Sequence, residues 1–133
     1  MNEDYPRRAF DPEIHTAQSI CGMMHASKSE ALIATQLTRY GISFRYEPKM
    51  ILSNGRIKYP DFLIKHPKTG ELIIWEHFGM MEKWDYVENN MNKLKDYAHE
   101  GFLINRNVIV TMESNDIHLS YEEVNRIIEQ WFM

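Results

Sequence analysis

The sequence feature that most constrains the fold is a pair of short apolar runs, FLI and IIW, separated by a turn-forming segment at residues 66–70. Apolar runs on either side of a segment that contains Pro and Gly are typical of a β-hairpin. An acid borders each run, Asp61 before the first and Glu76 after the second. The two acids are equidistant from the middle of the Pro67–Gly70 turn. Such residues lie opposite each other in an antiparallel hairpin, with Cβ atoms about 4.5–5.5 Å apart. The sequence therefore predicts two carboxylates side by side on adjacent strands.

Two opposed carboxylates among apolar side chains must be neutralised, because like charges that face each other across a sheet are destabilising. One carboxylate could hold a proton, a basic side chain could pair with both, or a divalent cation could bridge them. Oxygen ligands of this kind favour Mg²⁺ or Mn²⁺ over Zn²⁺. A solvated pair at an exposed edge of the hairpin is the alternative that the residues alone leave open.

A basic partner for the two acids is available on a helix predicted over residues 84–100. Lys93 shares a helical stripe with Tyr86, Asn90 and Tyr97, beside the apolar face, and could point toward the sheet. Lys95 falls on the polar face and is expected to point to solvent. A lysine at the border of an apolar face is also common without any such role. The apolar face itself is predicted to consist of Trp84, Val87, Met91, Leu94 and Ala98.

The chain divides into an N-terminal extension, residues 1–25, and a single domain over residues 26–133. Within the extension, Asp11 followed by Pro12 is typical of a helix start. This pattern predicts that the extension is partly helical and that its helix ends near Gly22.

The domain begins with a helix predicted over residues 27–41, which Gly41 ends. Ser27 and Glu30 have the spacing of a capping box, in which the glutamate side chain bonds back to the cap. Glu30 also stands at the head of the apolar stripe of this helix. The residues alone leave open whether its side chain completes the cap or serves another purpose.

The remaining segments alternate between strand and helix patterns and define the fold class. Three strands that follow one another are expected to pair antiparallel, and the helix after them permits a parallel fourth strand. The expected architecture is therefore α/β, with an αβββαβ core and a mixed four-stranded sheet flanked by helices. The strands are predicted over residues 42–52, 57–65, 71–77 and 106–113, and a last helix over residues 120–133. Pro48 is expected to interrupt the first of these strands or to mark a bulge in it.

Composition limits the compartment and the mode of binding. A net charge of -4 argues against a protein that binds nucleic acid over a broad basic face. No stretch approaches the roughly 18–20 apolar residues of a membrane span. Because Cys21 is the single cysteine and no apolar signal segment is present, a reducing compartment, the cytoplasm, is expected.

Three acids together resemble a known nuclease pattern. Asp61 lies in YPDF, Glu76 follows in WEHFG fifteen residues later, and Glu30 lies upstream on a helix. This arrangement resembles the PD-(D/E)XK nuclease superfamily, which has the restriction-endonuclease-like fold. The resemblance covers about residues 27–113, and its αβββαβ order agrees with the order derived above from periodicity.

The resemblance implies a metal site in which Asp61 and Glu76 are the central ligands. The backbone carbonyl of His77 would add a ligand, and Glu30 would bind the metal directly or through water. The cofactor implied is Mg²⁺ or Mn²⁺. Glu30, Asp61 and Glu76 would form the catalytic set with a lysine.

The position of that lysine departs from the pattern. The resemblance implies a lysine two residues after Glu76, but Phe78 stands there. Related branches of the superfamily place it on the following helix, which makes Lys93 the candidate. His77 is a second candidate for assisting the reaction or for binding a phosphate.

The expected function is a metal-dependent nuclease that hydrolyses phosphodiester bonds of nucleic acid, DNA rather than RNA. A homodimer and a place within a larger protein are both compatible with this function, and no membrane partner is expected. Candidate contacts to the nucleic acid are Arg45, Lys49, Arg56, Lys58 and His77.

Two rival functions remain at this level. The first is a module of the same fold that binds nucleic acid or protein without catalysis, which the acidic balance and the missing lysine at position 78 favour. The second is a small-molecule metalloenzyme, which is less favoured because the six histidines show no zinc-ligand spacing. Burial of Lys93 against the acids would favour the nuclease, and exposure of Lys93 would favour the binding module.

Overall fold

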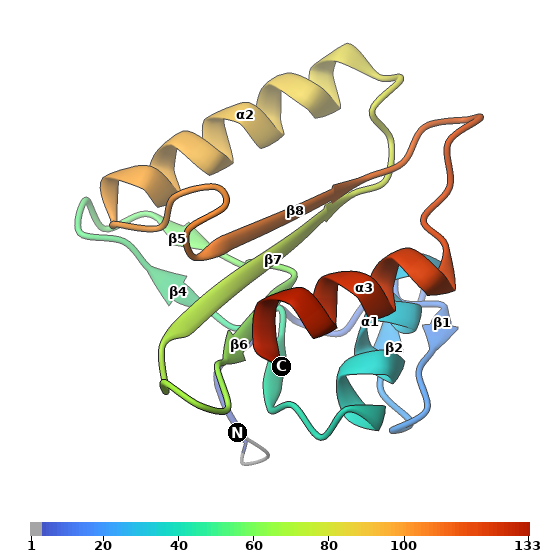
Figure 1. Cartoon of the computed structure of the whole chain (residues 1–133). Helices are drawn as coiled ribbons and strands as arrows, with labels where there is room; N and C mark the ends of the chain where they lie inside the picture. The colour runs from blue at the N-terminus through green and yellow to red at the C-terminus, as the bar shows by residue number, and fades with distance from the viewer. Residues whose placement is uncertain (1–3) are drawn as a thin grey trace.

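A mixed four-stranded sheet in the order β3-β6-β7-β8 organises the fold (Figure 1). The computed structural model describes residues 4–133. The sheet consists of β3 (Phe44–Tyr46), β6 (Phe62–Lys65), β7 (Leu72–Phe78) and β8 (Val108–Met112). The helices are α1 (Lys28–Arg39), α2 (Trp84–His99) and α3 (Tyr121–Phe132). Two small hairpins pair β1 (Ala17–Gln18) with β2 (Met24–His25) and β4 (Met50–Ile51) with β5 (Ile57–Lys58). The predicted α/β class with a mixed sheet and flanking helices is confirmed.

The register of the central hairpin is the one that the sequence predicts. Strands β6 and β7 pair antiparallel, with Phe62 opposite Trp75. The next pair outward from the turn is Asp61 and Glu76, so the two acids meet where β6 begins. Strands β7 and β8 pair parallel, with Trp75 opposite Ile109. Helix α2 makes the crossover between them, as a parallel pair requires.

The two faces of the sheet are covered unequally (Figure 1). Helices α1 and α3 lie on one face and enclose the larger core, which includes Ile73 and Trp75 of β7. Helix α2 lies on the other face, toward which Ile74 and Glu76 point because side chains alternate along a strand. Tyr97 is the one residue of α2 that is buried. The α2 face therefore retains room for a cavity beside the two acids.

The apolar face predicted for the helix over residues 84–100 is wrong at three positions. Trp84 and Met91 are 68% and 59% exposed, and Ala98 is also exposed. The stripe that contains Lys93 and Tyr97 faces the sheet instead. The reason is that this part of the sheet presents a buried carboxylate, and a buried acceptor without hydrogen bonds is costly.

The helix predicted after Asp11 does not form. Asp11 caps only the single turn at residues 12–14, where the Glu13 amide donates to its side chain, and the chain then enters the β1–β2 hairpin. The imidazole of His15 leaves this turn to contact Glu47, a residue 32 positions away. The local start signal is therefore overridden by a long-range contact. Gly22, the predicted helix end, lies in the hairpin turn with a φ of 86°.

Two of the predicted strands are divided. The strand over residues 42–52 is interrupted at Glu47, which has a φ of 48°, and at Pro48, so that β3 and β4 belong to different sheets. Residues 59–61 divide the strand over 57–65 into β5 and β6.

Among residues 4–133, no helix has the length and apolarity needed to cross a membrane.

His25 of β2 is a fully buried histidine inside the main core. Neither of its ring nitrogens has a hydrogen-bond partner among the described residues. Its ring packs edge-on against Tyr46, with centroids 4.3 Å apart. Burial, with a smaller contribution from His15, lowers the pKa of His25 from 6.5 to about 4.

This histidine should make the fold sensitive to acid. The lowered pKa means that the folded state holds His25 neutral, so its contribution is complete above pH 6.5 and is lost as the pH falls toward 4. The loss amounts to about 3 kcal/mol. We expect the melting temperature of His25→Phe to fall less than that of the wild type over this range. The exposed His99→Phe serves as control, and equal acid sensitivity of wild type and His25→Phe would contradict the assignment.

Candidate active site

Asp61 and Glu76 lie side by side at the start of β6 and near the end of β7. The Asp61 amide donates to Oε1 of Glu76 over 3.3 Å, and the His77 amide donates to Oδ2 of Asp61 over 2.8 Å. Each strand thus uses its backbone to hold the carboxylate of the other. Glu76 is buried, with 1% of its surface exposed, and Asp61 is half-buried. The hypothesis of a solvated pair at an exposed edge is therefore wrong.

Helix α2 supplies the groups that balance Glu76. The ammonium of Lys93 lies 3.0 Å from Oε2 of Glu76 and donates to the Tyr59 carbonyl over 3.3 Å. The Tyr97 hydroxyl donates to Oε1 of Glu76 over 2.7 Å. The prediction that Lys93 points to the sheet is confirmed, as is the exposure of Lys95. Lys93 reaches the acids from the helix after the hairpin.

Phe78 stands at the position where the resemblance implies a lysine. It is buried and packs edge-on against Tyr86, with ring centroids 6.5 Å apart. It points to the same side of β7 as Glu76, two residues earlier, and helps to support α2 above the acids. The aromatic contact at position 78 and the ammonium from position 93 thus occupy the same face.

Glu30 enters the site from the first turn of α1. Its amide is capped by the Ser27 hydroxyl over 3.1 Å, but its carboxylate accepts a hydrogen bond from Tyr46 rather than closing the capping box. The side chain of Glu30 therefore does not complete the cap. Burial, reinforced by the charges of Glu47 and Glu76, raises the pKa of Glu30 to about 7.

One cavity of about 440 Å³ brings together Glu30, Asp61, Glu76 and Lys93. Burial and the neighbouring charges of Glu76 and Glu30 hold the pKa of Asp61 well above its usual range. Burial opposes the charged form of Lys93, yet Glu76 and Asp61 raise its pKa overall. The cavity lining contains five acids, Glu30, Glu47, Asp61, Glu76 and Glu113, against two permanent cations, Arg8 and Lys93. The excess of acids would be relieved by bound protons or by a cation.

A metal ion in this cavity would have few ligands from the protein. Among residues 4–133, no group of three or more His, Cys, Asp or Glu side chains is placed to hold a metal ion. Two carboxylates and a backbone carbonyl would be compatible with Mg²⁺, which binds through one or two carboxylates and retains several waters. Asp61 and Glu76 would be those carboxylates, with the His77 carbonyl beside them. Glu30 would then act through water.

The His77 side chain belongs to a hydrogen-bond network on the other side of β7. Its Nε2 lies 2.7 Å from Oε1 of Glu113, and its Nδ1 lies 2.8 Å from Oγ1 of Thr111. Ser29 of α1 donates to the same Glu113 oxygen over 2.6 Å. Burial lowers the pKa of His77. The network ties β7, β8 and α1 together around the cavity, and His77 and Glu113 both line it.

Of the five predicted nucleic-acid contacts, His77 lines the cavity, but Arg45, Lys49, Arg56 and Lys58 do not. Lys58 lies 3.1 Å and Arg56 lies 3.9 Å from Asp96 of α2. The Arg45 guanidinium lies 4.9 Å from the ring centroid of Tyr5. Lys49 is exposed on the segment after Pro48.

Arg8 and Glu47 line the cavity and were not indicated by the sequence. Their side chains are 3.4 Å apart but 39 residues apart in the chain, so no local pattern could pair them. Tyr97 is different, because it shares the helical stripe of Lys93 and could be inferred from it.

Comparison of the chain with protein-family models and with curated proteins finds no match.

Proposed function

We propose that the protein is a metal-dependent nuclease of the restriction-endonuclease-like class, acting on DNA. The observation that carries the proposal is the Lys93 ammonium, 3.0 Å from Glu76 and beside the paired Asp61. Such an arrangement of two carboxylates and a lysine at a strand end supports the resemblance to the PD-(D/E)XK pattern. The inward position of Lys93 is the feature expected of the nuclease rather than of a binding module.

The residues of this chain have distinct parts in the proposed reaction. Asp61, Glu76 and the His77 carbonyl would hold Mg²⁺ or Mn²⁺, with Glu30 acting through water. The bound cation supplies charge stabilisation on the phosphate and lowers the pKa of a water molecule. Lys93 would orient the attacking water or offset charge that builds on the phosphate. Tyr97 and the Asp61 amide fix the orientation of Glu76.

A binding module on the same fold is the second candidate. Both oxygens of Glu76 already accept hydrogen bonds from protein groups, as they would in a purely structural ion pair. In that case the cavity would bind nucleic acid or protein without cleaving it. The two functions differ in a single observable, the metal-dependent breakage of a phosphodiester bond.

A cleavage assay tests the proposal directly. Purified protein should cut at least one substrate among single-stranded, duplex and branched DNA when Mg²⁺ or Mn²⁺ is present, and none when EDTA replaces the cation. RNA substrates of the same sequences establish the preference for DNA. Binding without cleavage of any substrate in either cation would reject the nuclease and favour the binding module.

A further inference from the structure

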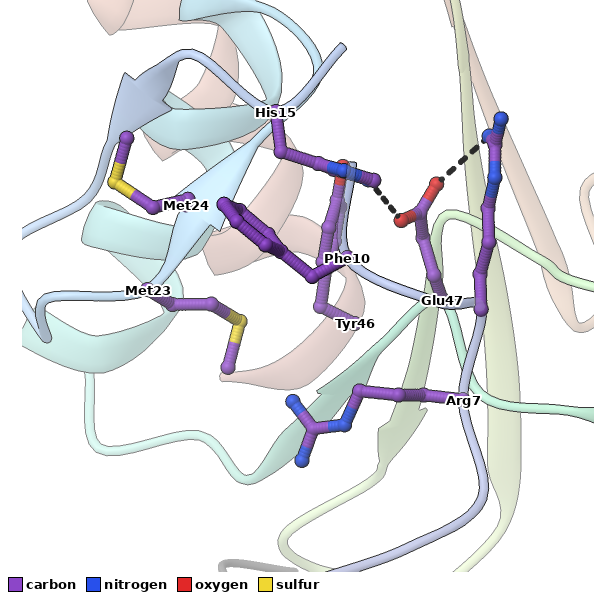
Figure 2. Close-up of a pocket in the computed structure, with 8 residues that line it drawn as sticks. Arg7, Phe10, His15, Met23, Met24, Tyr46 and Glu47 are labelled. Carbon is purple, nitrogen blue, oxygen red and sulfur yellow. Dashed lines mark hydrogen bonds and ion pairs between the residues drawn. The ribbon is translucent and has the colours of Figure 1, made fainter. Parts of the chain in front are cut away.

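A second hollow, of about 180 Å³, is lined by residues of the N-terminal segment, of the β1–β2 hairpin and of the end of β3 (Figure 2). Its walls include apolar side chains, Phe10, Met23 and Met24, and its rim includes Arg7 and Arg8. Drug-sized ligands occupy pockets of roughly 300–1,000 Å³, so this hollow suits a single flat group rather than a whole cofactor.

The hollow and the carboxylate cavity are neighbours with shared walls. Arg8 and Glu47 line both of them. A group that entered the hollow would therefore lie next to the site proposed for the scissile phosphate. Two groups joined by a short linkage, such as a base and its phosphate, could occupy the two spaces together.

The shared wall is held firmly in place. Glu47 accepts from Nε2 of His15 over 2.7 Å and from the Arg8 guanidinium over 3.4 Å, and both His15 and Glu47 are buried. The Arg8 amide also donates to the Glu47 carbonyl over 3.0 Å. These contacts hold Glu47 at a φ of 48°, a left-handed conformation that is uncommon outside glycine and often occurs at functional sites. The wall is thus built from residues that are far apart in the sequence.

Phe10 provides an aromatic face at this hollow. Phe10 is 64% exposed although it is large and apolar. Its ring stacks on His15, with centroids 5.7 Å apart and an angle of 25° between the planes. In Figure 2 the ring of Phe10 lies between the two methionines and the His15–Glu47 pair. An exposed ring next to basic side chains is the combination that binds single-stranded nucleic acid by stacking.

We infer that this hollow receives an unpaired nucleobase of the substrate strand, next to the phosphate that is cleaved. The inference deepens the proposed function and rests on it. The base stacks on Phe10, and the methionines supply polarisable apolar contacts. Arg8, whose side chain is 43% exposed, and the exposed Arg7 meet the flanking phosphates.

The chemistry of the hollow favours an unpaired base of any sequence. A base in a duplex is stacked on its neighbours and cannot enter unless it is extruded, which costs a few kcal/mol. The polar groups of the wall, His15 and Glu47, are already bonded to each other, so they offer little to read the edge of a base. Stacking accepts all four bases, because each has a π face. The preferred substrate is therefore single-stranded DNA or an unpaired flap.

Binding measurements separate this inference from the cleavage chemistry. Fluorescence anisotropy is recorded with labelled single-stranded DNA of about ten nucleotides and with the corresponding duplex. Ca²⁺ replaces Mg²⁺, because a hard cation takes the same carboxylate oxygens, and the recovered DNA is checked to be intact. Phe10→Ala should weaken binding of the single strand about tenfold, since stacking contributes about 1–3 kcal/mol per base. Binding of the duplex should change less than about twofold.

Matched variants complete the design. Phe10→Trp keeps an aromatic face and should retain affinity. Trp84→Ala removes an aromatic side chain that is 68% exposed on α2, outside both cavities, and should leave affinity unchanged. The inference is overturned if Phe10→Ala binds the single strand as the wild type does, or if Trp84→Ala weakens binding equally.

The outcomes also distinguish the two proposals. Metal-dependent cleavage together with unaltered binding by Phe10→Ala keeps the nuclease and rejects the base pocket. Selective loss of single-strand binding in Phe10→Ala, without cleavage by the wild type, keeps the pocket and rejects the nuclease. Selective loss of binding together with cleavage by the wild type supports both.

Discussion

Asp61→Asn should abolish metal-dependent cleavage and, in the same sample, remove the stabilisation that Mg²⁺ or Mn²⁺ gives to the fold. Asparagine keeps an oxygen that can accept from the His77 amide, but it loses the charge that attracts a cation. Substitution of groups that only support metal ligands already costs about 10–100-fold in affinity or activity. We therefore expect the rate of cleavage to fall by at least about 100-fold, measured under single-turnover conditions.

The effect of Asp61→Asn on the melting temperature should differ with and without the cation. Saturating cation at about 100 times its dissociation constant should stabilise the wild type by about 2.7 kcal/mol, a rise in melting temperature on the order of 10 °C. The variant should show no such rise. Without cation it should melt at or above the wild-type temperature, because Asp61 no longer repels Glu76 and Glu30.

A matched control for Asp61→Asn is Asp96→Asn. Asp96 pairs with Lys58 at 3.1 Å and does not line the carboxylate cavity. It should retain both cleavage and the response to cation. An Asp61→Asn protein that still melts higher with Mg²⁺ would show that the cation binds elsewhere.

The central hairpin could be predicted because its determinants are local. A turn with Pro and Gly fixes the register of its two strands, and a one-residue slip would have moved every buried side chain to the other face. The facing positions of Asp61 and Glu76 follow from that register alone. The parallel placement of β8 follows from the helix that precedes it.

The face of α2 that packs on the sheet could not be predicted from apolar periodicity, because a charged side chain rather than an apolar one faces the sheet here. Met91 and Trp84 are exposed, while Lys93 faces the sheet to balance the buried Glu76. The prediction of a helix in the N-terminal extension failed for a different reason. Its conformation depends on contacts of His15 and Arg8 with Glu47, which no window of the sequence contains.

Lys93→Met should destabilise the fold and lower the rate of cleavage, because it removes the ammonium beside Glu76. Methionine keeps most of the volume of the side chain, so packing changes little. Glu76 would remain 1% exposed with the Tyr97 hydroxyl and the Asp61 amide as donors, but with no positive charge in contact. Removing one partner of a buried ion pair costs about 3–5 kcal/mol, and we expect about 3 here, because 21% of the Lys93 side chain is exposed. The melting temperature should fall by roughly 10 °C.

Because a destabilised variant also loses activity by unfolding, the effect of Lys93 on the reaction needs variants that remain folded. Lys93→Arg keeps a positive charge near Glu76 and should retain most of the stability. The double variant Lys93→Met with Glu76→Gln removes both charges and should recover most of the loss seen in Lys93→Met, as a double-mutant cycle measures. Lys95→Met, at an exposed position of the same helix, should match the wild type in stability and in cleavage.

Cleavage by Lys93→Met at the wild-type rate, at a temperature where it is folded, would leave the ammonium a purely structural role and remove it from the catalytic set. A fall of about 100-fold under the same conditions would assign it to the transition state, where loss of one stabilising group costs about 10²–10³-fold.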